Sequence, residues 1–217
     1  MRKAPVTMTL LAVITAVWAF EVFTRAFDSN EMMVQLGAII PWRYMHGDYW
    51  RLFTAIFLHG SWLHWGANSW AIYQLGTLYE TLFGSKRFAL VFLVSGVCAS
   101  LASSFYIDGV GVGASGGVFG ILGAFVFSIW RSPQYRHQPW TKSLLGQILF
   151  WTVVNLYIGS QLPFIDNVAH VGGLVAGLLL GFIPHRVPPP PPSNSVIEVR
   201  PYDNGGTHEP PHRSFPE

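Results

Sequence analysis

Residues 167–184 read NVAHVGGLVAGLLLGFIP and contain no Asp, Glu, Lys or Arg. The segment approaches the roughly 20 residues that an α-helix needs to cross the hydrocarbon core of a membrane. Gly173, Gly177 and Gly181 recur at every fourth position and form one small-residue stripe, which lets another helix backbone approach closely. Two polar residues, Asn167 and His170, precede this stripe. The segment therefore predicts a closely packed transmembrane helix with a polar first turn.

Five more apolar segments precede this one, and together they predict an all-α membrane bundle of six transmembrane helices. The segments carry almost no charge, and they lack the strict alternation of a β-barrel strand. Because residues 5–20 are long and no small-residue cleavage site clearly follows, we interpret them as a retained helix rather than a signal peptide. The six segments are residues 5–20, 61–83, 88–107, 109–130, 143–165 and 167–184.

The composition of the whole chain agrees with a membrane protein. Of 217 residues, 51% are hydrophobic and only 11% are charged, whereas a soluble domain carries about 25% charged residues. The chain is too apolar to be intrinsically disordered, and Cys98 is its only cysteine, which excludes a disulfide scaffold. With 13 basic against 11 acidic residues, a nucleic-acid partner is not expected.

Basic residues cluster in the connections on one side of the predicted bundle. By the positive-inside rule this side is cytoplasmic, and both termini lie there. The long connection at residues 27–53 would face the outside, where its Trp and Tyr residues suit the membrane interface. The basic residues are Arg2, Lys3, Lys86, Arg87, Arg131, Arg136, Lys142 and Arg186.

The composition changes abruptly after Arg186. Residues 188–192 are all proline, which favours a stiff polyproline segment, and the remainder is polar and proline-rich. We therefore expect a membrane domain over residues 1–186 and a disordered cytoplasmic tail over residues 187–217. A solvated tail is favoured over one that binds a partner.

Three groups of polar residues occur in the apolar segments, where polar groups are costly. If the N-terminus is cytoplasmic, the second, fourth and sixth helices all run inward from the outer face, so their first turns share one depth. Each group lies in or near one of these turns. The groups are His59, His64 and Asn68; residues 113–116, which read GASG; and Asn167 with His170.

A serine and a histidine at one depth can act together in nucleophilic catalysis. Gly116, Gly120 and Ala124 form a second small-residue stripe. Alone, two such stripes would only pack helices. If they face each other, however, Ser115 and His170 come within side-chain reach, and the imidazole can take the proton of the serine hydroxyl.

Acyl transfer also needs donors for the negative charge that develops on the substrate oxygen. His64 and Asn68 are four residues apart, so both project from one helix face and can donate hydrogen bonds. The backbone N–H of Ser115, near the positive end of a helix, is a third candidate. Gly113 and Gly116 would let a substrate chain approach.

Taken together, these motifs resemble the rhomboid family of intramembrane serine proteases, over nearly all of the chain up to Pro184. By this resemblance Ser115 is the nucleophile and His170 the general base, while His64, Asn68 and the Ser115 N–H line the oxyanion hole. The shared motifs are WR at residues 50–51, His59, His64 and Asn68 with spacings of five and four, GASG at residues 113–116 and AHVGGLVAG at residues 169–177.

The resemblance also implies a substrate class and supporting residues. Single-pass membrane proteins would be cut in or near their transmembrane helix, and they would enter past a mobile gate around residues 151–161. His59 would tie the outer loop, which contains Trp50 and Arg51, to the second helix. Where many members carry a tyrosine four residues after the serine, this chain has Phe119, whose ring can still pack although it lacks a hydroxyl.

Physical chemistry adds one more expectation, a water-filled cavity above Ser115 that opens to the outside, because hydrolysis needs water that the hydrocarbon lacks. Asp166 could orient His170, but we favour a Ser-His dyad in which Asn167 or a backbone group assists. We expect no cofactor and no metal, the lipid bilayer as surroundings, and a bacterial inner membrane with the site open to its outer face.

Two alternatives remain at this stage. The first is a catalytically inactive rhomboid-like protein that binds membrane clients, which the Ser115–His170 pair disfavours. The second is a transporter or a zinc site of His59, His64 and His170, in which Asn68 and the glycine-flanked serine would have no role.

Overall fold

The computed structural model describes residues 4–162 and 165–184, and this part of the chain is helical without β-strands. The expected tail at residues 187–217 lies outside the described residues. The helices are α1 Pro5–Phe23, α2 Asn30–Leu36, α3 Arg51–Thr54, α4 Trp62–Ala71, α5 Thr77–Phe83, α6 Ser85–Ser104, α7 Ser115–Trp130, α8 Pro133–Arg136, α9 Pro139–Gln161 and α10 Asn167–Phe182. A π-helix at Ile72–Gly76 joins α4 to α5, and short 3-10 turns lie at Ala26–Asp28, Trp42–Tyr44 and Ala55–Phe57.

Several helices are apolar enough for a membrane, and α1, α6 and α9 are also long enough to cross one. The shorter helices α7 and α10 are apolar as well. Large apolar side chains remain exposed on α9, among them Leu149, Phe150 and Trp151, and hydrocarbon rather than water suits such a surface. The prediction of an all-α membrane protein is therefore confirmed.

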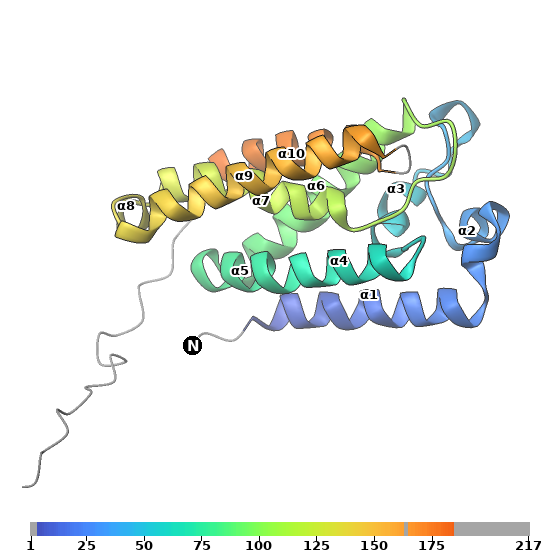
Figure 1. Ribbon diagram of the computed structural model, residues 1–217, viewed down its shortest axis with the longest axis horizontal. Helices are drawn as coiled ribbons and strands as arrows, with labels where there is room; N and C mark the ends of the chain where they lie inside the picture. Colours follow the sequence, from blue (N-terminus) through green and yellow to red (C-terminus); the bar gives the residue numbers. More distant parts are fainter. Residues whose placement is uncertain (1–3, 163–164, 185–217) are drawn as a thin grey trace, which may run out of the picture.

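Helices α6, α7 and α10 form the centre of the bundle and pack most extensively against one another. Figure 1 shows α4 and α5 alongside α1 on one side of this centre, and α9 on another side. The short helices α2 and α3 lie at the end of the bundle where α4 begins (Figure 1). This is the end that carries the polar residues identified in the sequence.

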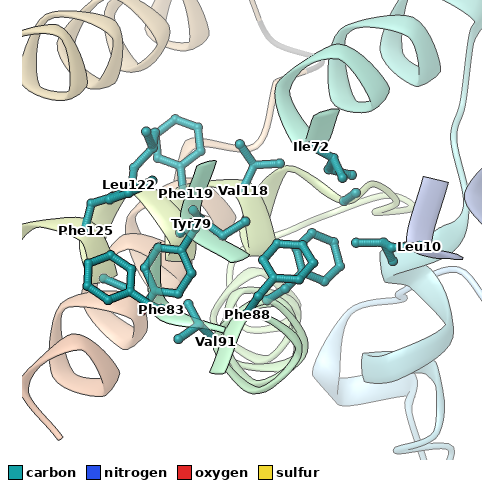
Figure 2. Close-up of a cluster of buried hydrophobic side chains, with 14 of the residues drawn as sticks. Leu10, Ile72, Tyr79, Phe83, Phe88, Val91, Val118, Phe119, Leu122 and Phe125 are labelled. Atoms are coloured by element: carbon teal, nitrogen blue, oxygen red, sulfur yellow. The ribbon is translucent and has the colours of Figure 1, made fainter. Parts of the chain in front are cut away.

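Aromatic side chains fill the core between α5, α6 and α7, as Figure 2 shows. Tyr79 and Phe125 are fully buried and meet edge to face, with ring centroids 5.0 Å apart. Phe83 lies beside both. Within a membrane, helices are held together by close packing rather than by removal of apolar groups from water. The packed rings therefore stabilise the bundle at the end away from the polar groups.

Local sequence signals explain where the helices begin. Pro5 and Pro139 occupy the first positions of α1 and α9, where a backbone N–H would have no partner within the helix. The side chain of Ser61 accepts a hydrogen bond from the backbone N–H of His64 and so caps α4. Asp166 caps α10 in the same way, through the N–H of Ala169. These caps fix the first turns from which the candidate site is built.

A buried carboxylate joins α1 to the start of α6 at the far end of the bundle. Glu80 accepts hydrogen bonds from the backbone N–H groups of Val6 and Thr7 at 3.0 and 2.8 Å. It also accepts from the hydroxyls of Thr7 and Ser85 at 2.7 and 2.5 Å. Because its side chain is almost wholly buried, these donors replace the water that the carboxylate has lost.

Candidate active site

Ser115 is the first residue of α7, and a tightly constrained loop leads up to it. Gly113 has a φ of 129°, which an L side chain rarely adopts. A β-carbon on Gly113 would lie 2.6 Å from two ring atoms of His64. The backbone N–H of Gly113 donates to the carbonyl of Ala55 at 2.9 Å. Only glycine fits this position, where the His64 ring lies against the backbone two residues before Ser115.

His170 lies in the first turn of α10, and its Nε2 is 3.0 Å from the Oγ of Ser115. The ring is mostly buried and stacks on Phe119, with centroids 4.2 Å apart and planes 8° from parallel. Stacking fixes the plane of the imidazole, and the helix fixes its position. The structure thus brings together the two side chains that the sequence pairs.

The two small-residue stripes face each other, which is the condition under which the sequence places Ser115 and His170 within reach. A β-carbon on any glycine of the α10 stripe would overlap or crowd backbone atoms of α7. Gly116 also lies against Ala99 of α6. The contact between the stripes sets the separation of the serine and histidine backbones. The facing pairs are Gly173 with Gly116, Gly177 with Gly120 and Gly181 with Ala124.

Asp166 is engaged in holding helices rather than in orienting the imidazole. One carboxylate oxygen accepts from the backbone N–H of Ala169 at 2.9 Å, and the other accepts a short hydrogen bond from the hydroxyl of Ser103 in α6. Among the described residues, the Nδ1 of His170 is buried without a hydrogen-bond partner. The carboxylate therefore fastens the start of α10 to α6.

His64 and Asn68 lie on α4 but differ in their surroundings. The ring of His64 lies against Gly113, two residues before Ser115 in the chain. Asn68 lies one turn further along the helix, is buried, and donates one amide N–H to the carbonyl of His64 at 3.0 Å. The second amide hydrogen of Asn68 is still available to a ligand.

His59 lies in the loop before α4 rather than in the helix. Its ring is fully buried, its Nδ1 is 3.2 Å from the carbonyl of Phe57, and its edge meets the ring of His64 at a centroid distance of 5.2 Å. Its backbone N–H donates to both carboxyl oxygens of Glu21 in α1, at 2.9 and 3.2 Å. His59 thus connects α1 to α4.

Trp50 and Arg51 organise the connection between α1 and α4. The guanidinium of Arg51 is paired with Asp48 at 3.1 Å and donates to the carbonyls of Val34 and Ala38, the first of these bonds being short. It also lies over the Trp50 ring, 4.5 Å from the centroid. The connection predicted at residues 27–53 is therefore folded around one buried cation.

Asn167 joins the start of α10 to the end of α9. Its side-chain amide donates to the carbonyl of Leu156 at 2.9 Å. Gly159 leaves room for this contact, because a β-carbon there would overlap the Asn167 side chain. Asn167 therefore holds α9 and does not hydrogen-bond to His170 in the described structure.

Two hollows among the described residues lie elsewhere. One of about 200 Å³ is lined mainly by apolar residues of α1 and α6, together with Phe53 and Phe57. One of about 170 Å³ lies between Trp42 and Phe105. Neither includes Ser115 or His170, so the expected cavity above Ser115 stays a prediction. In the described ranges, no three His, Cys, Asp or Glu side chains are grouped as a metal site requires.

Contacts between the loops near the start of α7 carry no signal in the sequence. Gly111 exchanges two backbone hydrogen bonds with Ile39, at 2.9 and 3.0 Å, and this pairing supports the loop before Ser115. Because backbone hydrogen bonds do not depend on the side chains, the pattern of residue types does not reveal this pairing. Glu21 is visible in the sequence as the acid that ends the first apolar segment, but the sequence does not identify its partner.

Comparison with known proteins identifies the family. The family model of the rhomboid domain matches residues 46–187. Rhomboid protease GluP of Bacillus subtilis is 33% identical over 149 residues, which are 69% of this chain and 29% of GluP. RHOMBOID-like protein 1 of Arabidopsis thaliana is 36% identical over 157 residues, which are 71% of this chain and 40% of that protein.

A third relative has nearly the same extent as this chain. The putative rhomboid protease YdcA of Bacillus subtilis is 28% identical over 186 residues, which are 84% of this chain and 89% of YdcA. GluP and RHOMBOID-like protein 1 are much longer, and the chain spans less than half of either. The family model covers most of the described bundle, including α7 and α10. The chain is therefore an integral membrane protein that belongs to the rhomboid family.

Proposed function

We propose that this chain is an intramembrane serine protease in which Ser115 is the nucleophile and His170 the general base. The observation that carries the proposal is the 3.0 Å separation of the Ser115 Oγ and the His170 Nε2 across two helices in backbone contact. The rhomboid protease names of GluP and YdcA support the same reaction class.

The geometry suits proton transfer from serine to histidine. With its proton on Nδ1, the imidazole accepts the Ser115 O–H through Nε2, and the oxygen attacks the carbonyl carbon of a peptide bond. The imidazole then returns the proton to the nitrogen of the leaving amine. Water, deprotonated by the same imidazole, hydrolyses the acyl-enzyme and releases the second product with the free serine.

A dyad agrees better with the contacts of the histidine than a triad does. Both oxygens of Asp166 are already occupied, by Ala169 and Ser103. The stack on Phe119 holds the imidazole plane in place of a third polar residue. Burial of the histidine and its stacked ring pre-organises the base without a third polar residue.

Donors for the developing oxyanion surround the start of α7. The His64 ring lies against the loop two residues before Ser115, and Asn68 on the same helix keeps one amide hydrogen available. The backbone N–H of Ser115 is at the positive end of α7. We assign the oxyanion hole to these three groups.

The proposed substrates are membrane proteins cut in or near a transmembrane helix. The proposed topology has six spans, formed by α1, the continuous α4–α5 helix, α6, α7, α9 and α10, with both termini in the cytoplasm. Lys86, Arg131 and Arg136 lie at the cytoplasmic ends of these helices in this topology, as the positive-inside rule requires. The site then opens to the outer face of a bacterial inner membrane.

The test is cleavage of a model transmembrane substrate by the purified chain in liposomes. Ser115→Ala and His170→Ala should each abolish cleavage. Ser104→Ala is the matched control, because Ser104 is also buried and its hydroxyl donates to Leu101 of its own helix. Cleavage that persists in Ser115→Ala would overturn the proposed mechanism.

Labelling with a fluorophosphonate separates this proposal from an inactive client-binding protein. The probe should attach to wild type and to Ser104→Ala but not to Ser115→Ala, since only an activated serine reacts. If wild type stays unlabelled under conditions that label an active rhomboid protease, the client-binding alternative is supported instead.

A further inference from the structure

A buried carboxyl group on α1 reaches the loop that carries His59, although α1 contributes nothing to the Ser115–His170 pair. Glu21 is fully buried, and both of its oxygens lie within hydrogen-bond distance of the His59 backbone N–H. A buried carboxyl group in a membrane helix is costly and calls for an explanation. Glu21 also lies before residue 46, where the match to the rhomboid family model begins.

The contacts continue from Glu21 to the candidate oxyanion donor. The His59 ring is held between its contact with Phe57 and the edge of the His64 ring. The His64 ring in turn lies against Gly113. A continuous path of close contacts therefore runs from α1, through one backbone N–H and two imidazole rings, to the loop before Ser115.

A second contact on the same side holds α4 on α1. Trp18, one turn before Glu21, stacks on Trp65 with centroids 4.2 Å apart and planes 13° from parallel. The edge of Trp62 meets the same Trp18 ring at 4.3 Å. The aromatic stack fixes the first turn of α4 against α1. The loop with His59, which leads into this turn, is therefore restricted at both ends, and the hydrogen bond to Glu21 sets its remaining position.

We propose that Glu21 is a positioning residue for the oxyanion hole: by accepting the His59 N–H, it holds the His59 ring against His64 and so places the His64 donor over the Ser115 loop. This inference rests on the proposed function of His64. Glu21 itself touches no reacting atom. Its contribution should therefore appear in the chemical step and not in the capture of substrate.

Substitutions at Glu21 test this role through separate measurement of kcat and KM in liposomes. Glu21→Leu keeps the volume and removes the acceptor, and kcat should fall about 10- to 100-fold with KM unchanged, a part of the 10²–10³ that a whole oxyanion donor provides. Glu21→Gln keeps an acceptor oxygen and should stay within about threefold of wild type. A fall in Glu21→Gln as large as that in Glu21→Leu would contradict the proposal.

Coupling to His64 distinguishes positioning from a general loss of structure. In a His64→Ala background, Glu21→Leu should change kcat by less than about threefold, because the group that it positions is gone. If Glu21→Leu lowers kcat by the same factor in both backgrounds, Glu21 is merely structural and the inference fails. Phe20→Ala, on the exposed side of α1, is the matched control and should leave kcat unchanged in both.

If Glu21→Leu does not fold, substitutions at His59, the next residue on the path of contacts, test the same inference. His59→Phe keeps a ring against His64 and should retain kcat, whereas His59→Ala should lower it about 10-fold or more, and only when His64 is present. Equal activity of His59→Ala and His59→Phe would overturn the inference. Retained cleavage in Ser115→Ala would instead overturn the proposed function, whatever the Glu21 variants do.

Discussion

Gly177 of α10 lies against Gly120 of α7 so closely that a β-carbon on Gly177 would overlap the Gly120 carbonyl oxygen. The contact is backbone to backbone, with no side chain that could move aside. Helices that meet in this way are held by van der Waals packing, which a single added methyl group disrupts. The separation of Ser115 and His170 therefore depends on residues that carry no side chain.

Gly177→Ala should destabilise the bundle by about 1–3 kcal/mol, because the extra carbon forces the two helices apart. The stability can be measured as the midpoint of thermal unfolding in detergent. Gly146→Ala on α9 is the matched control, since a β-carbon there has nothing within 4 Å, and it should leave the midpoint unchanged or slightly raised. Equal midpoints for the two variants would mean that α7 and α10 are not in backbone contact.

Gly113→Ala should lower activity more than it lowers stability. The positive φ makes alanine strained by about 1–3 kcal/mol, and its β-carbon would push the His64 ring away from the Ser115 loop. We expect kcat for a model substrate to fall at least about tenfold. Gly60→Ala, where a β-carbon would have only an ordinary contact with Val112, is the control and should keep normal activity. Normal kcat in Gly113→Ala would argue against a role for the His64 ring.

Phe119→Ala should slow cleavage by removing the ring that stacks on His170. Such an aromatic contact contributes about 0.5–1.5 kcal/mol, which corresponds to roughly a 2- to 12-fold loss in kcat if all of it orients the base. Phe119→Tyr keeps the stack and should retain activity. The prediction is wrong if alanine and tyrosine at this position give the same rate.

Glu80→Ala should be among the most destabilising changes at the end away from the site. Four hydrogen-bond donors from Val6, Thr7 and Ser85 would lose their acceptor. An orphaned buried donor costs about 1–3 kcal/mol, so a loss of at least about 2 kcal/mol is expected. Glu31→Ala, an exposed acid in α2, serves as the control. Below its lowered unfolding midpoint, Glu80→Ala should still cleave substrate, which would separate stability from catalysis.

Removal of divalent metals should leave cleavage unchanged. The proposed serine mechanism needs no Lewis acid, because in it His170 takes the proton of the nucleophile directly. The measurement is the cleavage rate in liposomes after treatment with EDTA, with added Zn²⁺ as the second arm. Loss of activity in EDTA that Zn²⁺ restores would favour the zinc site of His59, His64 and His170 over the dyad.

Periodic features of the fold could be predicted from the sequence. The apolar segments predict helices. The spacing of Gly173, Gly177 and Gly181 marks the face of α10 that lies against α7. The pairing of Ser115 with His170 followed from those two results, because each residue lies at the same end of its stripe. Repetition along a helix depends only on residues that are close in the sequence, so it can be recognised without the structure.

Contacts between distant segments could not be predicted. The hydrogen bonds of Glu21 with His59, Ser103 with Asp166 and Gly111 with Ile39 each join residues that share no period or motif. The sequence of residues 27–53 predicts only a long connection, whereas the structure folds it into α2, α3 and short turns around Arg51. Only tertiary packing decides which buried donor meets which acceptor.

The helices that hold the Ser115–His170 pair differ from α9 in how firmly they are enclosed. Helices α7 and α10 pack extensively against each other and against α6, whereas α9 packs only sparsely against α7 and α10. Only 17% of the apolar span of α9 is buried inside the protein. A thicker or thinner bilayer will therefore tilt α9 before it disturbs α7 and α10. Lipid composition should then control how often a substrate helix reaches the serine, while the rate of bond cleavage, once it is there, stays the same from one membrane to another.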